Sequence, residues 1–175
     1  MKRTLFALTA WLGLVLLAPA ERAHATETLA DALIDLPQIR GEAIQADDLD
    51  DKVVLVAFFA SWCPPCKHEF PHLNTVQKAY GDDGFKVIAV NVFEAFEGRS
   101  TPEKLDVFLD DVKPIFPIIK GNDETRRIFG DLDRIPTMFV FGRDGAPEYI
   151  FRHKRNAEKT HLTEEELREV IEPLL

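Results

Sequence analysis

Cysteine is scarce in this sequence, because Cys63 and Cys66 are the only two among 175 residues. Two cysteines three positions apart cross-link almost no chain and add little stability as a structural disulfide. A structural zinc site is disfavoured, because no second C-x-x-C pair exists to complete it. A haem-attachment motif needs histidine directly after the second cysteine, where Lys67 stands instead. The interpretation that best fits these absences is a redox-active pair of thiols.

Basic residues are fewer than acidic ones. The sequence has 21 Lys and Arg against 30 Asp and Glu, which gives a formal net charge of −9. An acidic chain argues against nucleic acid and anionic membrane surfaces as partners. Repeats and low-complexity segments are absent. Hydrophobic residues make up 46% of the sequence, which is enough for a real core. The sequence therefore predicts a single domain of about 150 residues behind a short leader.

The apolar stretch nearest the N-terminus, Leu5 to Ala18, is short for a membrane span. Two basic residues precede it and an A-x-A sequence, Ala23-His24-Ala25, follows it, which is the pattern of a secretory signal peptide. We therefore expect residues 1–25 to be removed and residues 26–175 to be exported to the periplasm. The alternative is an uncleaved N-terminal membrane anchor that holds the domain on the periplasmic side.

The two cysteines lie where a buried strand leads into a helix. The segment Val53–Phe59 is apolar without alternation, which indicates a central strand covered on both faces. The following segment, Pro64–Tyr80, has a helical pattern with proline at its first position. The first turn of a helix has unpaired N–H groups and the positive end of the helix dipole, both of which favour a thiolate. We predict that Cys63 is the nucleophile, with a lowered pKa, and that Cys66 closes the disulfide.

Two prolines, Pro64 and Pro65, each remove a backbone donor from this first turn. The N–H of Cys66 is then the main backbone donor that can reach the Cys63 sulfur, so we expect only moderate stabilisation of the thiolate. This favours a reductant over a strong oxidant, whose reduced form must be especially stable.

The rest of the chain alternates between strand and helix patterns. Two short strands, 33–35 and 42–44, are expected to form an N-terminal β-hairpin. Further strands are predicted at 85–92, at 116–119 along an edge, and in an antiparallel hairpin of 134–141 and 148–152. Helices are predicted at 102–112, after an Asn122 cap to Phe129, and after a Thr163–Glu166 capping box. The order predicts an α/β fold, a mixed central sheet with helices on both faces.

The sequence resembles those of proteins with the thioredoxin-like fold, and among them the exported TlpA/ResA-like thiol-disulfide oxidoreductases. The resemblance covers roughly Leu33 to the C-terminus. It is carried by the central strand that runs into W-C-x-x-C, by Pro71 five residues after the second cysteine, and by Ile135-Pro136-Thr137, which resembles the cis-proline loop. The segment from Asn91 to Ile119 resembles the central helical insertion of this branch.

The resemblance implies catalytic roles for Cys63, Cys66 and Pro136, with Trp62 and Ile135 next to the bound substrate. A cis bond before Pro136 would leave the Ile135 backbone free to pair with an extended substrate segment. The alternative is a proline that merely begins an edge strand.

One departure concerns the proton of the second thiol. Thioredoxins have a buried acidic residue six positions before the first cysteine, where this sequence has Ala57. Reaction at Cys66 still requires a proton acceptor. The resemblance points to Glu94, with Glu97 as the second candidate. The alternative for Glu94 is a solvated loop carboxylate.

The expected function is reduction of disulfides in periplasmic proteins, of the cytochrome c maturation or copper-site assembly type. Electrons would come from a membrane thiol carrier, and we expect a monomer without a cofactor. The alternative is a copper-binding metallochaperone that holds Cu(I) on its two thiolates. Such chaperones add a distant histidine, and neither His153 nor His161 stands at a matching place. The pair His68 and His72 has no third ligand in the sequence and is expected at the surface.

Overall fold

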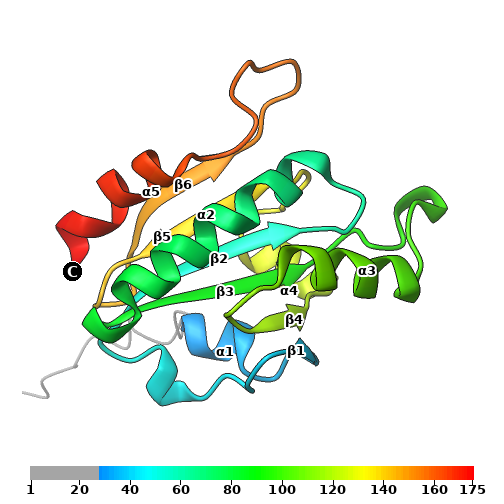
Figure 1. Cartoon of the computed structure of the whole chain (residues 1–175). Coiled ribbons are helices and arrows are strands. Elements are labelled where there is room, and N and C mark those ends of the chain that lie inside the picture. Colours follow the sequence, from blue (N-terminus) through cyan, green and yellow to red (C-terminus); the bar gives the residue numbers. More distant parts are fainter. Residues whose placement is uncertain (1–27) are drawn as a thin grey trace, which may run out of the picture.

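The computed structural model describes residues 28–175, so the predicted signal peptide and its cleavage site lie outside the described residues. The described strands form one sheet in the order β1-β4-β3-β2-β5-β6 (Figure 1). The central strand β2 (Val53–Phe59) pairs parallel with β3 (Phe85–Asn91) and antiparallel with β5 (Thr137–Phe141). The predicted mixed sheet is therefore confirmed, as is the position of its central strand.

The outer strands extend the sheet on both sides. On one side β4 (Ile118–Lys120) runs parallel to β3, and β1 (Gln38–Arg40) runs antiparallel to β4. On the other side β6 (Pro147–Arg152) pairs antiparallel with β5, which confirms the predicted hairpin.

Both faces of the sheet are covered, as two consecutive residues of β2 show. Neighbouring side chains of a strand point to opposite faces. The ring of Phe59 packs against Phe70 at 4.9 Å and against Phe108 at 5.5 Å between centroids. The ring of Phe58 packs on the other face against Phe129, at 4.8 Å. All seven residues of β2 are buried, which explains its apolar sequence without alternation.

The long helices have the bounds that the sequence predicts. Helix α2 (Pro64–Tyr80) crosses the face of the sheet seen in Figure 1, with α3 (Pro102–Val112) and α5 (Glu164–Ile171) beside it. Helix α4 (Asp123–Ile128) ends next to Phe129 on the opposite face. The predicted caps are confirmed, because Asn122 begins α4 and a Thr163–Glu166 capping box begins α5.

The prediction of an N-terminal β-hairpin is wrong. Residues 29–33 form a short helix, α1 (Leu29–Leu33), and residues 42–44 are not in a strand. A capping box between Thr28 and Asp31 starts this helix and satisfies its first N–H groups. Helix α1 is only five residues long, too short for an apolar period to distinguish it from a strand.

The strand predicted at 116–119 is present, but it is shorter at its start and is not at the edge of the sheet. Strand β4 begins two residues later, at Ile118, and β1 covers its outer side. The backbone of β1 therefore protects an edge that the sequence pattern left open.

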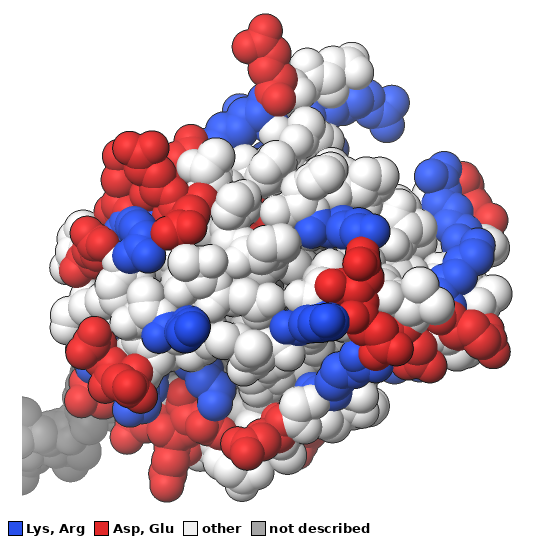
Figure 2. Space-filling model, in the orientation of Figure 1, with Lys and Arg blue, Asp and Glu red and all other residues white. Residues whose placement is uncertain are grey.

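Charges of both signs are interspersed on the face that carries α2, whereas acidic side chains gather over α5 (Figure 2). The excess of acidic residues thus does not form one continuous surface on this face. Among the described residues, we find no helix with the length and apolar character needed to cross a bilayer.

Candidate active site

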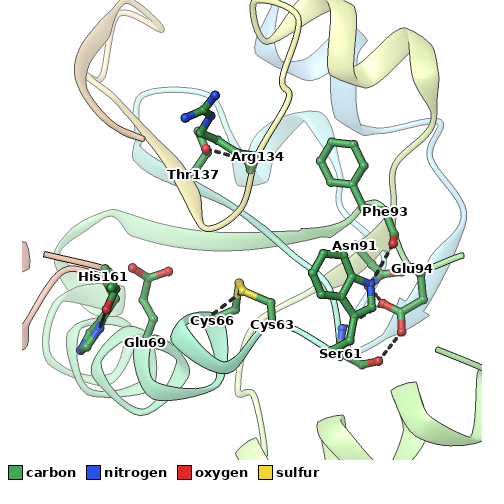
Figure 3. Close-up of a disulfide and its surroundings, with 12 residues drawn as sticks. Ser61, Cys63, Cys66, Glu69, Asn91, Phe93, Glu94, Arg134, Thr137 and His161 are labelled. Carbon is green, nitrogen blue, oxygen red and sulfur yellow. Dashed lines mark hydrogen bonds between the residues drawn. A yellow bond between two sulfur atoms is a disulfide. The ribbon is translucent and has the colours of Figure 1, made fainter. Parts of the chain in front are cut away.

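The two cysteines form a disulfide at the start of α2, with their Cα atoms 5.3 Å apart (Figure 3). Cys63 is the N-cap residue, with extended backbone angles, and its Sγ accepts a hydrogen bond from the N–H of Cys66 at 3.3 Å. Pro64 and Pro65 follow it in the first turn. Cys63 is 3% exposed and Cys66 is fully buried. A reactant that approaches from solvent therefore meets the Cys63 sulfur first.

The loop before β5 lies at the same end of the sheet. Thr137 pairs with Phe58 near the end of β2, so the preceding Ile135–Pro136 segment lies where β2 leads into Cys63. The peptide bond between Ile135 and Pro136 is cis. Within residues 28–175, neither the N–H nor the carbonyl of Ile135 makes a hydrogen bond. This backbone is thus free to pair with an added extended segment.

The indole of Trp62, the residue directly before Cys63, makes three contacts with one loop. Its Nε1 donates to the carbonyl of Phe93 at 2.9 Å, and its ring stacks on Phe96 at 5.9 Å between centroids. The guanidinium of Arg99 lies over the same indole at 5.2 Å from its centroid. All three partners belong to the loop between β3 and α3. That loop therefore fixes the orientation of Trp62.

The carboxylate of Glu94 connects this loop to the turn before Cys63. It accepts hydrogen bonds from the N–H of Ser61 at 2.9 Å, from the Ser61 hydroxyl, and from Asn91 Nδ2 at 2.7 Å. Burial opposes ionisation of Glu94, but hydrogen bonds from Asn91, Ser100 and Ser61 outweigh it and lower the pKa of this carboxyl. Glu94 is half-buried, so it is not the solvated carboxylate of the alternative interpretation.

The second candidate, Glu97, lies further along the same loop. It is exposed and pairs with Arg99 at 3.2 Å. That Glu94 accepts the proton of Cys66 stays a prediction, and Glu97 is not carried further because it is exposed and ion-paired.

Sequence reasoning did not identify Glu69, the most deeply buried carboxylate among the described residues. It lies one turn after Cys66 on α2 and is 2% exposed. Burial raises the pKa of Glu69 to about 8, and a hydrogen bond from the N–H of Leu162, at 3.2 Å, lowers it only in part. Figure 3 shows Glu69 and Glu94 on opposite sides of the disulfide.

A signal for Glu69 was present in the sequence. The buried positions of α2 include Cys66, Glu69, Leu73 and Val76, which recur at intervals of three and four residues. This is the period of one helix face. A glutamate on an otherwise apolar face, one turn from a cysteine, indicates a buried titratable group.

Three of the histidines, His68, His72 and His161, lie close together. The ring of His161 lies 6.0 Å from that of His68 and 6.1 Å from that of His72 between centroids. Within the described part of the chain, no three or more His, Cys, Asp or Glu side chains are grouped so that they could hold a metal ion.

The geometry defines a class: a thioredoxin-like domain with a C-x-x-C disulfide at a helix start, next to a cis-proline loop. Comparison with known proteins gives the family. The model of the Redoxin family matches residues 25–171, and the chain belongs to that family.

Several relatives are named for thiol-disulfide exchange. Thiol-disulfide oxidoreductase ResA of Bacillus subtilis is 30% identical over 112 residues, which cover 63% of this chain and 58% of the relative. Sporulation thiol-disulfide oxidoreductase A of the same organism is 29% identical over 148 residues, covering 84% and 87%. A solved structure described as a DsbE-type thiol:disulfide interchange protein of Chlorobium tepidum has 30% identity and a TM-score of 0.63, covering 79% of this chain and 90% of that one. The match thus spans a little over half the length of the first of these relatives.

Proposed function

We propose that this chain is an exported thiol-disulfide oxidoreductase that reduces disulfides of proteins outside the cytoplasm. The observation that carries the proposal is the Cys63–Cys66 disulfide at the N-terminus of α2, with the less deeply buried cysteine at the N-cap. The names of the ResA and sporulation relatives support the same reaction.

The reduced protein acts in two displacement steps. The Cys63 thiolate attacks one sulfur of a target disulfide, forms a mixed disulfide and expels the other target sulfur as a thiolate, which takes up a proton. Cys66 then loses its proton and attacks the Cys63 sulfur. The bond to the target breaks, the second target sulfur leaves as a thiolate, and the Cys63–Cys66 bond forms. Two electrons pass from the protein to the target.

Two neighbouring segments place the target. An extended stretch of the target pairs with the free backbone of Ile135, with Pro136 beside the sulfur atoms. The indole of Trp62 covers the other side of the attacked bond. The order of the sulfurs follows from burial, because Cys66 is the more deeply buried of the two residues.

The ionised form of Glu69, whose population grows as the pH approaches 8, accepts the proton that Cys66 releases. A proton acceptor works best when its pKa lies near that of the donor, and a free thiol has a pKa of about 8.5. The raised pKa of Glu69, about 8, is close to that value. The lowered pKa of Glu94 makes it a weaker base for the same step.

The natural target is a disulfide of the apocytochrome c or copper-site assembly type, and a membrane thiol protein restores the dithiol. Export through the predicted signal peptide places the reaction in the periplasm, where disulfides persist.

Reduction of insulin disulfides by dithiothreitol tests the proposed chemistry. The wild-type protein should accelerate insulin precipitation, and Cys63→Ser should abolish the acceleration. A wild-type rate equal to that of dithiothreitol alone would contradict the proposal.

A further inference from the structure

The loop between β3 and α3 is held in a conformation that a bulky residue rarely adopts. Phe93 has a φ of +57°, in the left-handed region that disfavours side chains with a Cβ. Such a backbone persists when the surroundings over-determine it, and it is found at functional sites. Here the reversal directs the Phe93 carbonyl at the Trp62 indole and places Glu94 against Ser61.

The contacts of Glu94 join two segments that are more than thirty residues apart in sequence. Its Oε2 accepts from the backbone of Ser61 and from Asn91, at the end of β3. The Ser61 hydroxyl donates to the same carboxylate and lies 2.6 Å from the hydroxyl of Ser100. Both ends of the loop, at Glu94 and Ser100, are therefore attached to the residue that precedes Trp62.

The same loop forms part of a hollow in the protein surface. This hollow of about 700 Å³ lies next to Trp62, and its lining includes Ser61, Trp62 and Arg99. Residues of α3 line it too, among them Val107, which is 69% exposed. Phe96, on the Trp62 side, is 46% exposed. The hollow is otherwise lined largely by charged side chains, and Val107 and Phe96 give it an apolar margin on which a docking polypeptide can bury surface.

We infer that Glu94 is a positioning residue for protein substrates: it holds the Ser61–Trp62 turn against the β3–α3 loop, so that the Trp62 wall next to Cys63 is already formed when a target arrives. This inference rests on the proposed function and specifies how that site selects its substrates. A preformed wall lowers the ordering cost of docking a polypeptide. A small disulfide that contacts only the sulfur atoms gains nothing from it.

The negative charge of Glu94 contributes to this positioning. Three donors converge on the two oxygens of Glu94, and hydrogen bonds to an ionised acceptor are stronger than those to a neutral one. Glutamine retains the shape and an accepting oxygen but lacks the charge. Alanine removes every contact.

The experiment compares Glu94→Ala and Glu94→Gln with the matched control Glu97→Ala, an exposed carboxylate of the same loop that pairs only with Arg99 among the described residues. Each reduced full-length variant reacts with insulin and, separately, with 5,5′-dithiobis(2-nitrobenzoate). With Glu94→Ala we expect the rate constant for insulin to fall roughly tenfold, the low end of the cost of losing charge-assisted hydrogen bonds. The rate constant for the small disulfide should stay within about twofold, and Glu94→Gln should recover part of the loss.

Trp62 supplies a readout that does not depend on the reaction. The chain has two tryptophans, so Trp62 is the only one in a Trp11→Phe background. Glu94→Ala should move its fluorescence emission to longer wavelength, as the indole gains contact with water, and Glu97→Ala should not. If Glu94→Ala fails to fold, Ser61→Ala carries the same test from the other partner.

Two results would overturn the inference. One is an equal insulin rate constant for Glu94→Ala and Glu97→Ala. The other is an equal fall for both disulfides, which would assign Glu94 to the thiol chemistry itself. If the wild-type protein reduced neither disulfide, the proposed function would fail, and the Trp62 emission would still decide whether Glu94 positions the indole.

Discussion

The backbone N–H of Leu162 donates to Oε1 of Glu69 at 3.2 Å and joins the loop before α5 to the helix that carries both cysteines. Within residues 28–175, it is the one hydrogen bond that the Glu69 carboxyl receives. A single donor does not offset the cost of burying a charge, so the carboxyl holds its proton up to about pH 8.

This relationship predicts how stability depends on pH. The pKa of Glu69 is higher in the folded protein, about 8, than its ordinary value of 4.5. The folded state therefore binds the extra proton between these values, and the free energy of unfolding decreases as the pH rises through this window. In the oxidised wild-type protein, the free energy of unfolding should fall by up to about 1.4 kcal/mol per pH unit within this window. In Glu69→Gln this fall should be absent. Urea unfolding of both proteins from pH 5 to pH 8 measures the difference, and parallel curves would contradict the assignment.

The second prediction concerns the kinetic role of the same carboxyl. In Glu69→Gln, formation of the mixed disulfide should proceed at the wild-type rate, because Cys63 carries out that step. Release of the target by Cys66 should slow by about a hundredfold near pH 8, where the wild-type carboxyl is about half ionised, which is the usual contribution of a positioned base. Single-turnover mixing with acid quenching and mass spectrometry separates the two steps. Glu97→Gln serves as the control, and a release step as fast as in the wild type would remove Glu69 from the mechanism.

The third prediction identifies the target. Replacement of Cys66 by serine leaves no thiol to displace the captured sulfur, so Cys66→Ser should accumulate a mixed disulfide through Cys63. Non-reducing electrophoresis of the exported protein, followed by peptide mapping, shows the adduct and its partner. Cys63→Ser is the control and should trap nothing, because Cys66 is fully buried. Equal trapping by both variants would contradict the order of the two sulfurs.

The fourth prediction tests the layer that supports the site. Phe59 is 1% exposed and packs against rings from both α2 and α3. Phe59→Ala should lower the free energy of unfolding by about 3–5 kcal/mol, through lost burial and the cavity left behind. Val107→Ala, on the exposed side of α3, should change it by less than about 0.5 kcal/mol. Denaturant unfolding of the oxidised proteins measures both values, and similar losses would show that this packing is not what anchors α2.

Much of the scaffold follows from the sequence because its signals are local. The seven apolar residues of β2 and the proline that begins α2 fix the place of the cysteines. The sequence Ile135-Pro136-Thr137 suggested a cis bond, which the structure contains.

The missed features depend on contacts between distant segments. The partner of β1 is β4, about eighty residues later, and no local pattern specifies that pairing. The burial of Glu69 depends partly on the loop that carries Leu162, 93 positions away. The attachment of Glu94 to Ser61 depends on the backbone reversal at Phe93, where the side chain itself disfavours the conformation.

Alkylation of the reduced protein by iodoacetamide tests the central claim most directly. The account predicts that Cys63 reacts and Cys66 does not, and that the rate rises with a midpoint near pH 7, below that of a free cysteine at about 8.5. Equal labelling of both sulfurs, or a midpoint of about 8.5 or above, would contradict a thiolate held at the start of α2. A midpoint near pH 4 would instead indicate the strong stabilisation of an oxidant, and would contradict the proposed reducing direction.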